Sequence, residues 1–225
     1  MILIVDERPL DSPFVDTIWR GRTERAGSRI APAGGCWVML VERQDSRLRL
    51  SVVGPMTKAM PMQYAGGVEF LAIKFKPGTY MPHLPVRNLL DAVVILPEAA
   101  SKSFWLNGSA WQFPDYENAD TFVDRLVREG PLVRDGVVDA VLQGRPLTLS
   151  SRSVQRRFLQ ATGLTHSSIR QIARARQAMT LLQQGTSILD TVYEAGYADQ
   201  PHLTKSLRHF IGQTPAQIVR LSQPG

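Results

Sequence analysis

The chain has a single cysteine, Cys36, and this scarcity excludes two kinds of stabilisation. One thiol cannot form an internal disulfide, and it cannot supply a cysteine-based zinc site. Because Cys36 precedes Trp37, we interpret it as a small buried hydrophobe, with a redox-sensing thiol as the less favoured alternative. Residues 1–118 contain one histidine, His83, which we expect at the surface or half-buried. Because a metal centre needs several converging ligands, we expect no bound metal and no cofactor.

Long apolar runs are also missing. No stretch approaches the ~18 uncharged apolar residues of a transmembrane helix. The N-terminus reaches Asp6 and Glu7 without the basic segment that opens a secretory signal peptide. With 44% hydrophobic residues, the composition is that of a globular chain. These features predict a cytoplasmic protein of one large domain or two modest ones, with no membrane partner.

Acidic residues are absent from one long segment, Ala140 to Leu189. Residues 120–225 hold 13 Lys and Arg against 8 Asp and Glu, whereas residues 1–119 hold 13 against 12. A surface with such an excess of positive charge attracts polyanions by counterion release and electrostatic steering. Charge alone leaves two interpretations open, a nucleic-acid surface and an ordinary solvated helix face. The arginines of the acid-free segment are Arg145, Arg152, Arg156, Arg157, Arg170, Arg174 and Arg176.

The two halves of the chain differ in their residue patterns, and this difference predicts an α+β fold. Short β-branched or aromatic segments between Gly and Pro turns predict strands at Trp37–Val41, Arg47–Val53 and Phe70–Phe75. They indicate an N-terminal β-rich domain over residues 1–118, cupin-like or a small barrel or sandwich, with a short helix within Leu84–Asp91. Residues 119–225 have helical spacing and predict an all-α domain. We place the boundary within residues 104–117, whose aromatics Trp105, Trp111, Phe113 and Tyr116 would pack the linker onto a domain.

The helical half contains an internal repeat, because residues 150–169 align with residues 199–218 after a shift of 49. In each copy a Ser or Asp can cap a helix of about three turns, and a glycine can end that helix in the left-handed conformation. A threonine then caps a following helix. The matched pairs are Val154 with Leu203, Arg156 with Lys205, Phe158 with Leu207, Gly163 with Gly212, Thr165 with Thr214 and Ile169 with Ile218.

Each repeat copy follows a shorter predicted helix, Asp135–Gln143 in the first case and Ile188–Ala195 in the second. The pattern is that of two helix-turn-helix units, at about 135–163 and 187–212, joined by a linker helix over 166–184. The loop GRPLTLS makes the first unit less regular. The linker helix would span roughly 28 Å at ~1.5 Å per residue, close to the ~34 Å between successive major-groove faces on one side of B-DNA.

Residues 119–221 resemble the DNA-binding domain of the AraC family of transcriptional regulators. The resemblance is strongest over IRQIARARQAMTLLQQG and SILDTVYEAGYADQPHLTKSLRHFIGQTPAQI. It implies base contacts by the first recognition helix from Arg152, Gln155 and Arg156. It implies contacts by the second from Gln200, Pro201, His202, Thr204 and Lys205. Phosphate contacts would come from Arg157, Arg208 and the helix starts at Thr165 and Thr214. Pro201 departs from the hydrogen-bonding residues often found at its position and can offer only apolar contact.

The same resemblance implies an N-terminal sensing or dimerisation domain, often a cupin-like barrel. A small-molecule effector would be lined by Trp37, Met39, Phe70, Phe75 and Met81, which are equally suited to a plain core. The implied partners are double-stranded promoter or operator DNA, RNA polymerase, an effector and a second copy of the chain. Whether the protein acts as an activator or as a repressor stays open.

Two other functions compete with a sequence-specific transcription regulator that is not an enzyme. The first is a small-molecule-binding or enzymatic N-terminal domain, with the helices as a regulatory or interaction module. The residues show no nucleophile–base pairing or metal spacing that favours it. The second is a protein-interaction adaptor, whose association with DNA would depend little on salt.

Overall fold

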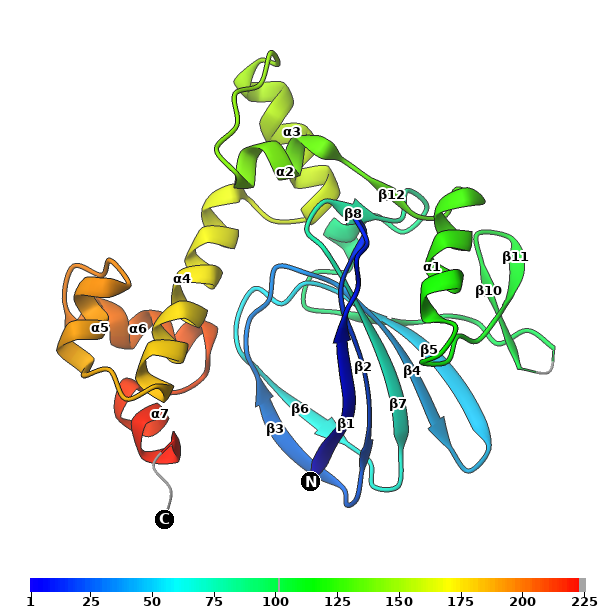
Figure 1. Cartoon of the computed structure of the whole chain (residues 1–225), viewed down its shortest axis with the longest axis horizontal. Helices are drawn as coiled ribbons and strands as arrows, with labels where there is room; N and C mark the ends of the chain where they lie inside the picture. The colour runs from blue at the N-terminus through cyan, green and yellow to red at the C-terminus, as the bar shows by residue number, and fades with distance from the viewer. Residues whose placement is uncertain (101, 223–225) are drawn as a thin grey trace. The chain divides into compact units, whose positions relative to one another are not determined.

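The computed structural model describes residues 1–100 and 102–222 (Figure 1). Its contacts divide the chain into two compact units, each made of several chain segments. We call them the sheet unit, formed by Met1–Gly27, Cys36–Pro55 and Gln63–His166, and the helical unit, formed by Ser28–Gly35, Met56–Met62 and the chain from Ser167 onward. The helical unit therefore includes two segments from the N-terminal half.

A six-stranded antiparallel sheet forms the centre of the sheet unit. Its order is β1 (Ile2–Pro9), β2 (Val15–Thr23), β7 (Glu69–Phe75), β4 (Val38–Gln44), β5 (Arg47–Val53) and β9 (Val93–Ile95). The predicted strands at Arg47–Val53 and Phe70–Phe75 correspond to β5 and β7, and the prediction at Trp37–Val41 overlaps β4. Strands β1 and β2 were not predicted; a bulge between Ile4 and Asp6 interrupts the regular side-chain alternation of β1.

One face of this sheet carries the main hydrophobic core, which α1 (Ala119–Arg128) and the hairpin β10 (Ser103–Leu106) and β11 (Ser109–Gln112) cover. Helix α1 contributes Phe122, Val123 and Leu126, which lie on one helical stripe. Of the four linker aromatics expected to pack, Trp111 is buried and Phe113 and Tyr116 pack at the margin of the core. The expectation for Trp105 is wrong, because the residue is 47% exposed, whereas its neighbour Phe104 is buried.

The first helix-turn-helix also belongs to the sheet unit. It consists of α2 (Gly136–Leu142) and α3 (Ser151–Thr162), and α3 packs against β8 (Thr79–Tyr80) and the 3₁₀ turn η1 (Val86–Asn88). Strand β12 (Val133–Arg134) pairs with β8 and leads into α2. The helix expected within Leu84–Asp91 is reduced to η1, because Pro85 precedes it and Asp91 takes a positive φ of 54°.

The helical unit contains most of α4 (His166–Gln183) together with α5 (Ile188–Glu194), α6 (Gln200–Phe210) and α7 (Pro215–Ser222). Their buried faces form a second core, to which α6 contributes Leu203 and Leu207. Strands β3 (Gly27–Ala31) and β6 (Met60–Tyr64) pair with each other. Most of their residues belong to the two N-terminal segments of this unit. The linker helix expected over residues 166–184 is confirmed to within one residue by α4.

The predicted fold class, a β-rich N-terminal region followed by a helical C-terminal region, is confirmed. The proposed domain boundary between residues 118 and 119 stays a prediction about independent folding, because compact units made of several segments do not test it. Among the helices of the described residues, none has the length and apolar character that crossing a membrane requires.

Candidate nucleic-acid interface

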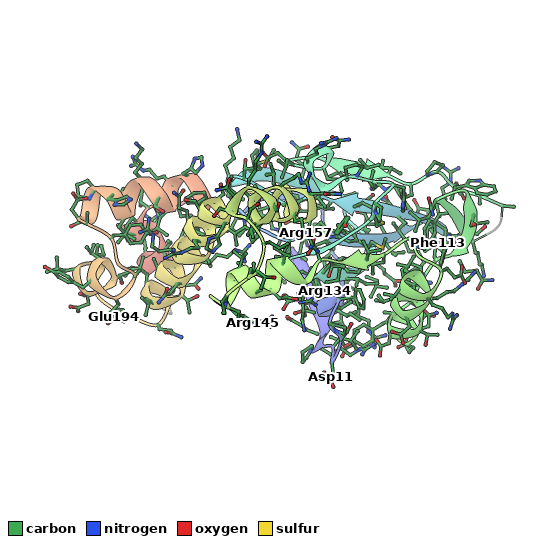
Figure 2. All side chains as sticks on the ribbon, turned by 90° about the horizontal axis from the view of Figure 1, so that it is seen from above. Asp11, Phe113, Arg134, Arg145, Arg157 and Glu194 are labelled. Atoms are coloured by element: carbon green, nitrogen blue, oxygen red, sulfur yellow. The ribbon has the colours of Figure 1, made fainter. Side chains whose placement is uncertain are left out.

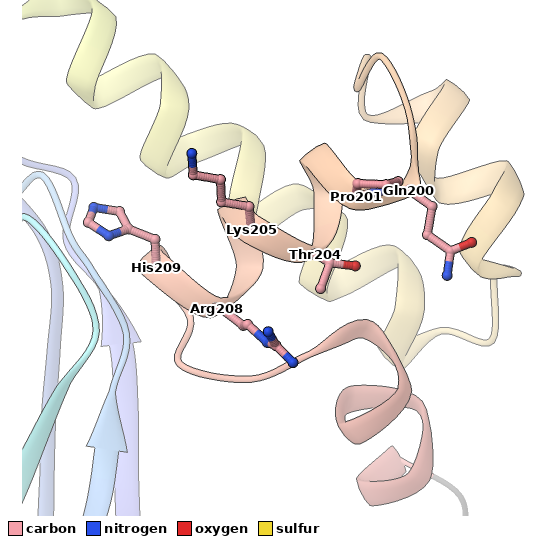
Figure 3. Close-up of a pocket in the computed structure, with 6 residues that line it drawn as sticks. All are labelled: Gln200, Pro201, Thr204, Lys205, Arg208 and His209. Carbon is pink, nitrogen blue, oxygen red and sulfur yellow. The ribbon is translucent and has the colours of Figure 1, made fainter.

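Helix α6 is the predicted second recognition helix, and its two sides differ sharply. Asp199 caps its start by accepting a hydrogen bond from the His202 amide at 2.7 Å. Leu203 and Leu207 have no exposed surface and fix the inner side. The outer side borders an open hollow of about 830 Å³, lined by Gln200, Pro201, Thr204, Lys205, Arg208 and His209 (Figure 3). Five of the predicted contacts therefore share one surface.

This outer surface holds hydrogen-bond donors and positive charge, with no acidic residue on α6 itself. Arg and Lys can reach guanine or phosphate oxygens, and Gln and Thr can donate to or accept from base edges. His202, the remaining predicted contact, is exposed, and its ring meets the Tyr197 ring edge-on at a centroid distance of 5.1 Å. Pro201 lies in the first turn of α6, where a missing N–H costs no helical hydrogen bond.

The turn before α6 is held by Tyr197, which is 5% exposed. Its hydroxyl lies 2.9 Å from the Ser206 hydroxyl, and the Arg174 guanidinium lies over its ring at 4.5 Å. Gly196 adopts a positive φ of 69°, which a residue with a side chain rarely takes. These contacts orient α6 relative to α5 and α4.

Helix α3, the predicted first recognition helix, begins and ends at the residues that the repeat predicts. Ser150 caps it through the Ser153 amide, and Gly163 ends it with a φ of 70°. Its outer side exposes Arg152, Gln155 and Arg156, the residues expected to contact bases. This surface is richer in arginine than that of α6 and is free of acidic residues.

Arg157, expected to contact a phosphate, is bound to a carboxylate. Its Nε and Nη2 atoms donate to Asp135 at 2.8 Å and 2.7 Å, and these hydrogen bonds raise the pKa of Arg157 above its usual value. Asp135 also caps α2 by accepting from the Val137 amide. Figure 2 shows Arg157 with Arg134, which pairs with Asp139 of α2. In this arrangement Arg157 holds α3 against α2, and its phosphate contact stays a prediction.

The two threonines predicted at helix starts lie at the expected places. Thr214 precedes α7, where its hydroxyl accepts from the Gln217 amide and its own amide donates to the Gln217 side chain, a reciprocal cap. Thr165 directly precedes α4 and is exposed. Contact of a DNA phosphate with either helix start stays a prediction.

The candidate effector residues do not form one surface. Trp37, Met39, Phe75 and Met81 are buried in the main core, where the Trp37 and Phe75 rings stack at 4.0 Å. The Trp37 indole donates to the Thr79 carbonyl. Phe70 lies on the opposite face of the sheet, because it is out of phase with Phe75 along β7. Four of the five residues are therefore packing residues of the core. The effector pocket stays a prediction, and these four residues cannot line it while they are packed in this way.

Two titratable candidates remain, His83 and Cys36. His83 is exposed, and partial desolvation lowers its pKa below the ordinary value. Cys36 is half-buried rather than fully buried. Within residues 1–100 and 102–222, no group of three His, Cys, Asp or Glu side chains is placed so that it could hold a metal ion.

Ala33 and Ala59, which lie far from α6 in the sequence, contact its C-terminal end and were not predicted. Their amides donate to the Phe210 and His209 carbonyls. No residue-type pattern marks such contacts, because every residue except proline carries the same backbone donor.

Comparison with known proteins adds two family matches. Residues 145–220 match a helix-turn-helix domain, and residues 9–94 match a domain of unknown function (DUF6597). No curated protein matches the chain by sequence.

Solved structures of ToxT from Vibrio cholerae are similar at low scores. The one bound to (E)-4-(8-methylnaphthalen-1-yl)but-3-enoic acid has a TM-score of 0.43 and 10% identity, covering 92% of this chain and 98% of that one. The one bound to an unsaturated fatty acid has a TM-score of 0.39 and 8% identity, covering 94% and 97%. Similarity this low transfers neither a ligand nor a function.

Proposed function

We propose that this chain, a DNA-binding transcription regulator whose residues 145–220 form an AraC-type helix-turn-helix domain, recognises specific duplex sequences with two helices. Helices α3 and α6 would each enter a major groove of double-stranded promoter or operator DNA. The observation that carries the proposal is the shared character of their outer sides, which are exposed, free of acidic residues and rich in Arg, Lys and Gln.

The continuous helix α4 supports a site that spans two successive grooves. Its 18 residues give a length of roughly 27 Å at ~1.5 Å per residue. A linker helix of that length suits two reading helices about one helical turn of DNA apart. Because one chain supplies both helices, the proposed site is asymmetric.

The test combines selection with substitution. Selection of bound sequences from a random duplex pool should return one asymmetric motif of about two helical turns. Arg156→Ala and Lys205→Ala should each weaken binding to that motif by about 1–3 kcal/mol and relax the preference at different base pairs. Arg128→Ala, at an exposed arginine of α1, provides the control with the same loss of charge.

Two results would contradict the proposal. If neither substitution changes affinity or preference, the assigned helices do not read bases. If the selected pool shows no motif but binding depends strongly on salt, the chain binds DNA through phosphates alone.

We further propose that the β-rich region senses a small apolar effector at the sheet face opposite the main core. Trp19 and Leu40 lie directly opposite Ala72 in neighbouring strands and share that face with Phe70. All three large side chains are half-buried, unlike the packed residues of the core. A ligand that raises the melting temperature of the wild type should lose this effect in Phe70→Ala. An unchanged shift would place the ligand elsewhere.

The remaining parts of the proposal concern binding partners and cellular location. A transcription regulator acts where the DNA and RNA polymerase are, and we therefore propose that this protein acts in the cytoplasm. Contact with RNA polymerase and self-association into a homodimer stay predictions, and the direction of regulation stays open. Analytical ultracentrifugation with and without operator DNA tests the homodimer.

A further inference from the structure

Two loops from the N-terminal half complete the C-terminal end of α6. We call residues 28–35 and 56–62, which include parts of strands β3 and β6, the loop pair; both belong to the helical unit. The Ala33 amide donates to the Phe210 carbonyl at 2.7 Å, and the Ala59 amide donates to the His209 carbonyl at 2.8 Å. The last carbonyls of a helix have no partner within the helix, so the loop pair supplies donors that α6 cannot supply itself.

Side chains fix the same contact. Arg176 of α4 donates from Nε to the Ala33 carbonyl at 2.9 Å. At Gly212, just beyond α6, an added Cβ atom would lie 2.5 Å from Ile30 Cγ2 and 3.1 Å from Ala59 Cβ. The loop pair is therefore packed closely against the end of the recognition helix, and its position relative to α6 is defined.

The charge of the loop pair matches that of the helix it contacts. Residues 28–35 and 56–62 carry Arg29 and Lys58 and no acidic residue, and both cationic side chains are exposed. Within the described part of the chain, neither takes part in an ion pair. The helix end beside them carries Arg208 and His209, which line the outer hollow of α6.

Lys58 lies next to that surface. It precedes Ala59, whose amide binds the His209 carbonyl, so the Lys58 Cα lies within roughly 5 Å of that carbonyl oxygen. A recognition helix in a major groove is flanked by the phosphates of the groove wall, and these phosphates accept hydrogen bonds from lysine. The Cα of Lys58 is thus placed beside the end of α6, and its exposed side chain is long enough to reach a phosphate there.

We propose that Lys58 contacts a DNA phosphate beside the C-terminal end of α6, so that the N-terminal half of the chain supplies part of the DNA interface. This inference rests on the proposed function of α6. The competing role for Lys58 is structural, because a cation near a helix C-terminus also stabilises the helix through its dipole. The two roles differ in one measurable quantity, the salt dependence of DNA binding.

The experiment titrates the full chain with a labelled random-sequence duplex of about 40 base pairs, at salt concentrations from about 0.05 to 0.2 M. Losing one phosphate contact should lower the slope of log K against log salt by about 0.9 and weaken binding by about eightfold at 0.1 M salt. Lys58→Ala should show this loss, and Lys58→Arg should restore the slope. Lys102→Ala, at an exposed lysine of the sheet unit, is the control for charge and should leave the slope unchanged.

The outcomes separate this inference from the proposed function. A wild-type slope in Lys58→Ala overturns the phosphate contact, and a lower melting temperature in the same variant would then assign Lys58 to the stability of α6. An equal change of slope in Lys102→Ala would also overturn it, because net charge would be the cause. Failure of the wild-type chain to bind any duplex would defeat the proposed function together with this contact.

Discussion

The two helix-turn-helix units share their local design and differ in what supports them. Both recognition helices begin at a side-chain cap and are followed within two residues by a glycine with positive φ. Helix α6 inserts Leu203 and Leu207 into a core formed by helices of the C-terminal region. Helix α3 instead has a half-buried Val154, packs against β8 and η1, and is tied to α2 by an ion pair.

This difference shows that the repeat encodes the helices but not their surroundings. Position 157 in the first unit corresponds to Ser206 in the second, and the two residues hold their helices by different means. Arg157 uses an ion pair with Asp135, whereas Ser206 uses a hydroxyl contact with Tyr197. We therefore expect equivalent substitutions in the apolar stripes and in the caps to have unequal effects, whereas the terminating glycines, which the repeat does match, should respond alike.

The largest difference is expected in the hydrophobic stripe. Leu203→Ala should lower the free energy of unfolding by about 2–5 kcal/mol, because it opens a cavity at a side chain with no exposed surface. Val154→Ala should cost only about 1 kcal/mol, because the side chain is smaller and half-buried. Urea denaturation followed by far-ultraviolet circular dichroism measures both. Equal losses would mean that the two stripes are equally packed.

The two terminating glycines should show the next largest effect. Gly163→Ala and Gly212→Ala place a Cβ at positive φ and against neighbours, 3.1 Å from Leu90 Cδ2 and 2.5 Å from Ile30 Cγ2 respectively. We expect each to cost about 2 kcal/mol, from backbone strain of about 1 kcal/mol plus the contact. Gly185→Ala is the matched control, since its φ is 92° but nothing lies within 4 Å of the added atom.

Thermal denaturation of the three glycine variants separates strain from crowding. The control should lose stability through strain alone. If Gly185→Ala costs as much as the other two, the close contacts at Gly163 and Gly212 contribute nothing.

The smallest difference concerns the caps of α2 and α5. Asp135→Ala should cost about 2 kcal/mol, because it removes both a helix cap and the half-exposed ion pair with Arg157. Ser187→Ala removes only the cap of α5 and should cost about 1 kcal/mol. In an Arg157→Ala background the cost of Asp135→Ala should fall toward that of Ser187→Ala. An undiminished cost in that background would show that the pair adds no stability.

The sequence predicts the C-terminal helices well because their signals are local. Caps at Ser150 and Asp199, glycines at the helix ends and apolar stripes act within one or two turns, so each boundary follows from a short window. The hairpin of β10 and β11 had a local signal too, Asn107-Gly108, and both residues take the positive φ of a tight turn.

The parts that could not be predicted depend on residues far apart in sequence. The ion pair between Asp135 and Arg157 needs two neighbouring helices in place before either partner can be identified. The division of the five candidate effector residues between two sheet faces follows from strand register, which alternation alone does not determine. The contact of the loop pair with α6 uses backbone amides, which leave no mark in the composition.

The way the loop pair caps α6 also bears on how the protein folds during synthesis. Ala33 and Ala59 leave the ribosome long before His209 and Phe210, so these hydrogen bonds form only when the last part of the chain has emerged. Closing so long a loop costs entropy that local helix contacts do not incur. The second recognition helix therefore receives its final support at the end of folding, and its reading surface is completed last.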